Sequence, residues 1–135
     1  MSDATFPDYS YRPDLDLFTV RWLTHEHLAT ARRDYEALLL LPEARRTTRW
    51  LFDVRRRPST STANAQWVVG DWLPRAAALL PTFLHLAYLV APTRAEELAA
   101  DTPLRTVVEP ATRPGLPYRL RIFTEEGAAV AWLLG

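Results

Sequence analysis

Arginines gather in one short part of this 135-residue sequence, on either side of an apolar segment. Six of the sixteen basic residues fall within thirteen positions, and these are Arg45, Arg46, Arg49, Arg55, Arg56 and Arg57. The last three lead into a run of hydroxyl side chains: Ser59, Thr60, Ser61 and Thr62. Guanidinium forks, hydroxyl donors and the free N–H groups of a helix start all bind phosphate or carboxylate groups. The pattern therefore predicts an anion site over residues 55–62, with Asp53 directly before it.

A plainer interpretation of the same residues is a solvated turn whose arginines pair with Asp53 or Glu43. Every basic residue is arginine and none is lysine, so a genome-wide codon preference accounts for part of the arginine content. The absence of lysine also excludes Schiff-base chemistry and a Walker-type phosphate loop. The sequence leaves both interpretations of the arginines open.

Trp67 and Trp72 follow the arginine loop and are the second candidate site. Tryptophan is enriched where proteins bind partners, so the pair predicts a hydrophobic pocket or a partner patch. The alternative is that both indoles cover the sheet as core residues. On one continuous α-helix, residues five apart would not share a face, and Gly70 between them leaves their relation open.

Metal binding and catalysis find little support in the sequence. His25 and His27 are two apart and cannot chelate as an i, i+4 pair would, and His85 fits a hydrogen-bonded position in a strand. The chain has no cysteine and only four glycines, and it lacks a G-x-S-x-G elbow and an H-E-x-x-H pair. We therefore expect no metal, no cofactor and no enzymatic activity.

Composition indicates one globular domain over residues 1–135, with residues 1–8 as a flexible N-terminal tail. The formal net charge is zero, which argues against a dedicated nucleic-acid binder. The longest aliphatic run has four leucines, at 38–41, far short of the ~20 residues that a membrane span needs. No targeting segment is evident, so we expect a cytoplasmic protein.

The hydrophobic pattern predicts an α/β fold. Strands are expected at residues 9–12, 17–23, 49–54, 84–90 and 118–123, and helices at 24–41, 62–69, 71–80, 93–100 and 125–134. Asp71 is expected to cap the second piece of a helix that breaks at Gly70. Residues 101–117 contain four prolines and predict only a short helix or an irregular segment at 104–109. The order ββαβαβαβα predicts a mixed, mostly parallel sheet with one antiparallel strand.

This order resembles the STAS-like family, the domain of bacterial anti-sigma-factor antagonists, and within it a branch of small stand-alone bacterial proteins. The matching marks are the tyrosine-rich first strand, VRWL at 20–23, LFDVR at 51–55, Trp67, and AWLL at 131–134. The resemblance covers residue 9 to the end. It implies a non-catalytic regulatory or protein-interaction module that acts through the loop and helix after the third strand.

The resemblance also implies a phosphorylation switch at a serine close behind a strand-terminal aspartate. Asp53 matches the place of that aspartate, but the loop that follows is longer and more basic than in the antagonists. Ser59 or Ser61 is the equivalent serine, and the offset does not decide between them.

Two other functions remain open: a binder of a small anionic ligand at residues 55–62, and a carrier of an apolar ligand between the sheet and a movable helix. Hinge candidates for such a helix are Gly70, Pro74 and residues 103–117. The partner is thus another protein or a small ligand, and a homodimer through the strand at 118–123 is possible, although its arginines oppose that pairing.

Overall fold

The computed structural model describes residues 6–22, 28–57 and 61–135. Five strands in this part of the chain form one sheet: β1 (Asp8–Arg12), β2 (Leu17–Arg21), β3 (Arg49–Asp53), β4 (Leu84–Leu89) and β5 (Tyr118–Phe123). The strands lie in chain order, β1 pairs antiparallel with β2, and β2 to β5 are parallel. The predicted α/β class and the mixed, mostly parallel sheet are confirmed.

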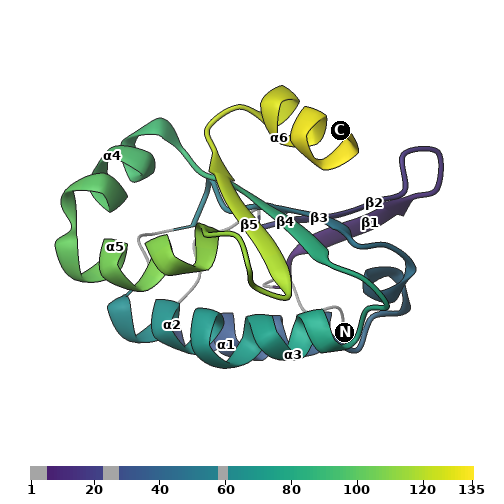
Figure 1. Cartoon of the computed structure of the whole chain (residues 1–135), viewed down its shortest axis with the longest axis horizontal. Coiled ribbons are helices and arrows are strands. Elements are labelled where there is room, and N and C mark those ends of the chain that lie inside the picture. The colour runs from purple at the N-terminus through teal and green to yellow at the C-terminus, as the bar shows by residue number, and fades with distance from the viewer. Residues whose placement is uncertain (1–5, 23–27, 58–60) are drawn as a thin grey trace.

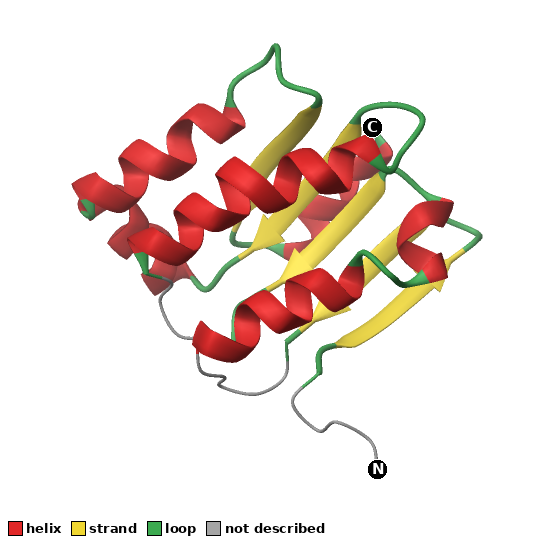
Figure 2. Cartoon of the chain, turned by 90° about the horizontal axis from the view of Figure 1, so that it is seen from below, coloured by secondary structure: helices red, strands yellow, loops and turns green. Residues whose placement is uncertain are grey.

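Helices cover both faces of this sheet. They are α1 (Leu28–Leu38), α2 (Thr62–Trp67), α3 (Leu73–Ala78), α4 (Pro92–Ala100), α5 (Thr102–Val108) and α6 (Glu126–Leu134). Each parallel connection moves one strand further in the same direction, and right-handed crossovers then place their helices on one face. Figure 1 shows α1, α2 and α3 below the sheet and α6 above it, and Figure 2 views the lower helical layer in front of the strands.

The alternation of side chains along β3 divides the core between these two faces. Trp50 and Phe52 point into the larger core under α1 to α3, and Leu51 points into the smaller core beneath α6. Because both faces are covered, the three central residues of β3, Trp50 to Phe52, are apolar on both faces of the sheet, as the sequence predicted.

Phe52 lies at the centre of an aromatic cluster in the larger core. Its ring centre is 5.5 Å from that of Trp22, 5.9 Å from Trp72 and 6.0 Å from Tyr35. The Trp72 Nε1–H donates to the Tyr35 carbonyl oxygen at 2.8 Å. This hydrogen bond ties the helix after β3 to α1.

The expected break at Gly70 is wrong. The chain stays helical from α2 into α3 through a π-helical turn, Val68–Trp72, and Asp71 caps nothing but accepts a hydrogen bond from Arg75. The extra residue in this turn brings Trp67 and Trp72 to one side, where both rings contact Tyr35, at 6.1 and 4.7 Å between centres. A regular α-helix would have separated them.

Of the two alternatives for residues 104–109, the short helix is present as α5, which starts slightly earlier, at Thr102, and is followed by a 3₁₀ turn, Glu109–Thr112. Helix α5 begins where Asp101 Oδ1 accepts a hydrogen bond from the Leu104 N–H at 3.0 Å. The predicted N-terminal tail, residues 1–8, extends too far toward the C-terminus. Asp8 already belongs to β1, and the Phe6 ring packs against Tyr9. The predicted helix start at residues 24–27, with His25 and His27, lies outside the described residues.

Replacing the buried indole that joins α1 to the π-helical turn tests this arrangement. We expect Trp72→Phe to lower the free energy of unfolding by about 1–3 kcal/mol, because the Tyr35 carbonyl loses its buried donor. Urea unfolding followed by far-UV circular dichroism measures the loss. Trp67→Phe is the matched control, since this half-buried ring should cost less. Equal losses would contradict the assigned role of the Trp72 hydrogen bond.

Candidate functional site

The structure divides the arginine cluster between the two ends of β3. Arg45 and Arg46 belong to a 3₁₀ turn, Pro42–Arg46, before the strand, and Arg46 lies over the Tyr11 ring. Arg55 and the arginines after it follow the other end. A five-residue strand separates the groups by about 16 Å, so the six arginines do not form one anion site.

Asp53 ends β3 with its carboxylate fully engaged. Its Oδ1 accepts from the Arg55 backbone N–H at 3.1 Å and from Arg55 Nε at 3.0 Å. Its Oδ2 accepts from Arg55 Nη2 at 2.8 Å and from Arg21 Nη1 at 2.9 Å. Burial favours the neutral acid, but these hydrogen bonds outweigh it and hold the pKa of Asp53 below its ordinary value. The carboxylate therefore acts as a structural anion rather than as a base.

Glu126 extends this ion-pair network to α6. Arg21 donates two parallel hydrogen bonds to Glu126, at 2.8 and 2.9 Å, and Arg55 Nη2 lies 3.5 Å from Glu126 Oε1. The hydrogen bonds from Arg21 hold the pKa of Glu126 below its ordinary value. Thus the charge of Arg55 is compensated at the sheet edge, as the plainer interpretation of the arginines expected.

Arg57 turns the opposite way, into the protein. The Arg57 N–H donates to the Val54 carbonyl oxygen at 3.1 Å, which closes a turn, and the side chain is only 8% exposed. Its guanidinium lies 5.1 Å from the centre of the Trp22 ring, a cation–π distance. Arg56 between them is exposed, so the three consecutive arginines have three different environments.

The last two residues of the hydroxyl run, Ser61 and Thr62, lie at the start of α2. Ser61 is the N-cap of α2, and its Oγ accepts a hydrogen bond from the Asn64 N–H at 3.0 Å. Thr62 is the first residue of α2. Ser59 and Thr60 lie outside the described residues.

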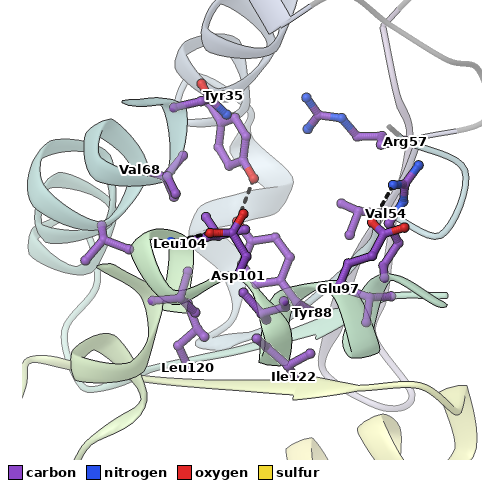
Figure 3. Close-up of a pocket in the computed structure, with 17 residues that line it drawn as sticks. Tyr35, Val54, Arg57, Val68, Tyr88, Glu97, Asp101, Leu104, Leu120 and Ile122 are labelled. Atoms are coloured by element: carbon purple, nitrogen blue, oxygen red, sulfur yellow. Dashed lines mark hydrogen bonds and ion pairs between the residues drawn. The ribbon is translucent and has the colours of Figure 1, made fainter. Parts of the chain in front are cut away.

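Behind Arg57 a cavity of about 410 Å³ lies between the sheet and the helices. Figure 3 shows the side chains from several elements that line it, and the cavity is partly open to solvent. Tyr88, Leu120 and Ile122 form its floor on β4 and β5, while α2, the π-helical turn and α4 to α5 supply aliphatic walls such as Val68 and Leu104. Its volume is in the range of small-molecule sites, and aliphatic and aromatic side chains form most of its surface.

Alanines in α4 explain why this space is not filled. The helix has the sequence PTRAEELAA, none of its residues is buried, and Leu98 is its one large apolar side chain. A crossover helix normally covers two strands with a row of large apolar residues. In this crossover α4 contributes no buried residue and α5 contributes one, Leu104. Few apolar side chains therefore cover this part of β4 and β5.

Tyr35 and Tyr88 place two hydroxyl groups in the cavity wall. Their oxygens are 2.6 Å apart, and either can be the donor. Burial raises the pKa of both phenols above 10, and for Tyr35 the nearby charge and hydrogen bond of Arg57 offset part of that rise. Both side chains therefore remain neutral at physiological pH.

These tyrosines were missed by the sequence analysis. A tyrosine on the buried face of a helix and another in an interior strand each need a hydrogen-bond partner for the hydroxyl, and that need was the available signal. Trp67 and Trp72, which were predicted to line a pocket, do not border the cavity. Trp72 is completely buried in the core, and Trp67 is half-buried beneath the guanidinium of Arg32.

Searches for other sites within the described ranges give two results. Residues 6–22, 28–57 and 61–135 contain no group of three potential metal ligands, and His85 packs its ring against Trp132. No helix in these ranges is long and apolar enough to cross a membrane. Comparisons of the chain with protein-family models, curated proteins and solved structures found no match.

The ion-pair network predicts a pH-dependent stability. The pKa of Asp53 is lowered by folding, so its ionised form stabilises the fold fully above its unfolded value, near 4, and this contribution is lost as the pH falls through the folded value. We expect Asp53→Asn to lower the free energy of unfolding by about 1–3 kcal/mol at pH 7. The difference in unfolding free energy between the wild type and Asp53→Asn should become smaller below about pH 4, as measured by urea unfolding at a series of pH values.

Asp14→Asn is the matched control for this prediction, because Asp14 also pairs with an arginine, Arg12, at 2.7 Å, but both side chains are exposed. Screening by solvent makes such a pair a small contributor. A gap that stays constant from pH 7 to about pH 3, or an equal loss in Asp14→Asn, would contradict the role of Asp53.

Proposed function

We propose that this protein binds a small, largely apolar molecule in the cavity between the sheet and helices α2, α4 and α5. The cavity itself, about 410 Å³ and lined mainly by aliphatic side chains, is the observation that carries the proposal. The cavity is partly open to solvent, and a concave, mainly apolar surface of this size is typical of small-molecule sites.

The position of the cavity fits an exchangeable ligand. It lies at the carboxyl ends of β3 and β4, where Val54 and Val90 follow the strands, and open parallel sheets bind ligands at this edge. Helix α4, which contributes no buried residue, borders it on the outside. Weak burial gives such an element a low free energy of local opening, so α4 is the helix expected to move when a ligand enters.

Binding without catalysis is the better-supported form of this function. The carboxylates that border the cavity within the described ranges are Glu97 and Asp101. Glu97 accepts a hydrogen bond from Arg94 and Asp101 accepts one from the Leu104 N–H. Asp53, at the end of β3, is occupied by Arg55 and Arg21. The two tyrosines are neutral, and neither hydroxyl has a general base within hydrogen-bond distance in the described part of the chain. The groups around the cavity recognise a ligand and lack the means to activate a nucleophile.

A neutral fluorescent probe, N-phenyl-1-naphthylamine, tests the proposal. Its emission rises in apolar surroundings, and we expect saturable binding to the wild-type chain. Val108 lines the cavity and Val107, its neighbour on α5, does not. Val108→Phe should therefore weaken binding about tenfold by occupying the space, whereas Val107→Phe should leave it unchanged. Absence of binding, or the same affinity in both variants, would contradict the proposal.

A second candidate function is a phosphorylation-controlled interaction module, which the STAS-like resemblance implies. Ser61 is the serine that the described part of the chain offers for this switch: it is the N-cap of α2 and lies four residues after Arg57 in the sequence. A phosphate there would meet the free N–H groups of the helix start and nearby positive charge.

Mass spectrometry of the protein isolated from its native host tests this second function. We expect a phosphate on Ser61 in a fraction of the molecules, and a protein that co-purifies with the unphosphorylated form alone. A chain that is unmodified at residues 59–62 under all growth conditions would contradict the switch. The binding of the naphthylamine probe does not depend on this outcome.

A further inference from the structure

The inner end of the cavity is where its polar groups meet. Arg57 comes from the loop after β3, Tyr35 from α1 and Tyr88 from β4, and Figure 3 shows the three around the same space. The positive charge of Arg57 is near enough to offset part of the burial-induced rise in the pKa of the Tyr35 hydroxyl. The cavity is thus amphipathic, with aliphatic walls and a cationic, hydroxyl-bearing end.

Arg57 brings a positive charge into this end without a carboxylate to balance it. Arg57 is only 8% exposed. No carboxylate in the described ranges lies within 4.0 Å of its guanidinium nitrogens. Asp34, a buried carboxylate on α1, lies 4.0 Å from Arg33 Nε and does not line the cavity. The cation–π contact with Trp22 compensates such a charge only in part.

The two carboxylates that border the cavity are engaged at its rim. Glu97 on α4 accepts a hydrogen bond from Arg94 at 2.9 Å, and Asp101 caps α5 through the Leu104 N–H at 3.0 Å. Both acidic side chains are exposed. The electrostatic potential at the inner end is therefore set mainly by Arg57.

The tyrosine pair adds a hydrogen-bond donor beside this charge. Two phenols carry two O–H protons, and the contact between Tyr35 and Tyr88 uses one of them. Arg57 cannot accept the other proton, because a guanidinium has no hydrogen-bond acceptor. No other acceptor for it is found in the described part of the chain. One O–H donor is therefore available next to one guanidinium.

From this arrangement we infer that the ligand is an amphiphile with a terminal carboxylate, such as a medium-chain alkanoic acid. The carboxylate binds Arg57 and the Tyr35–Tyr88 hydroxyl pair, and the alkyl chain lies against Val68, Leu104 and Ile122. This inference rests on the proposed binding function and names its ligand class. A carboxylate carries a single charge, which matches one guanidinium, whereas a phosphate dianion would need a second cation and an ammonium group would be repelled.

Isothermal titration with decanoate, 1-decanol and decyl phosphate tests the head-group assignment at constant chain length. We expect the wild-type protein to bind decanoate about tenfold or more tightly than 1-decanol, because hydrogen bonds to charged groups are the stronger ones. Equal affinities for decanoate and 1-decanol would overturn the inference, as would tighter binding of decyl phosphate than of decanoate.

Two arginine variants locate the charge that is responsible. Arg57→Met keeps the length and apolar stem of the side chain and should bind decanoate and 1-decanol with equal affinity. Arg56→Met, its exposed neighbour in the same loop, should retain the wild-type preference. A preference for decanoate that survives in Arg57→Met would overturn the inference. Continued binding of 1-decanol shows that the Arg57→Met cavity is intact.

Tyr88→Phe provides a second, independent variant. It removes one of the two hydroxyls at the inner end and should weaken decanoate binding several-fold, while binding of the neutral naphthylamine probe persists. Decanoate affinity equal to that of the wild type would contradict a role for the tyrosine pair. If the wild-type protein binds none of the probes, the proposed function fails as well; if it binds them without preference for decanoate, only the carboxylate assignment fails.

Discussion

The carboxylate of Asp53 determines the path of the loop on which the candidate site depends. It accepts both the backbone N–H and the guanidinium of Arg55 and also a hydrogen bond from Arg21. These bonds hold Arg55 at the sheet edge against Glu126. The chain then turns through the Val54–Arg57 hydrogen bond, and Arg57 enters the protein. One ion-pair network thus fixes α6 on one face of the sheet and directs a cation into the cavity beneath the other.

A buried arginine without a carboxylate is costly, because the desolvation of its charge is repaid only in part by an aromatic face and a phenol. A methionine or leucine of similar size would fill the position at a lower energetic cost. Natural sequences depart from the most stable choice mainly at functional sites. The position of Arg57, at the inner end of a mainly aliphatic cavity, therefore supports a role in recognition over a role in stability.

The sequence predicted the fold more completely than the site. The class, the five strands and the helix after Ser61 follow from hydrophobic periodicity and capping, which are local properties. The π-helical turn was not predictable in this way: Gly70 and Asp71 are breaker residues locally, and the burial of Trp72 against Tyr35 overrides them. The sequence identified the arginine loop as a candidate site. It did not indicate which of the three adjacent arginines would point into the protein, because their local sequence environments are nearly the same. Tyr35 and Tyr88 are 53 residues apart, and only the parallel sheet brings their hydroxyls together.

The cavity and the capped helix are parts of one segment, which links the two candidate functions physically. Arg57 lies within the loop between Asp53 and Ser61, and Ala65 and Val68 in the helix that Ser61 caps line the cavity wall. A ligand that binds Arg57 would favour one arrangement of the loop, and a phosphate on Ser61 would attract the same arginines toward the helix start. The two events would then bias one structural element, and by linkage each would change the free energy of the other by an equal amount. Competition for Arg57 makes that coupling negative, so phosphorylation would weaken ligand binding and a bound ligand would disfavour the phosphorylated loop conformation.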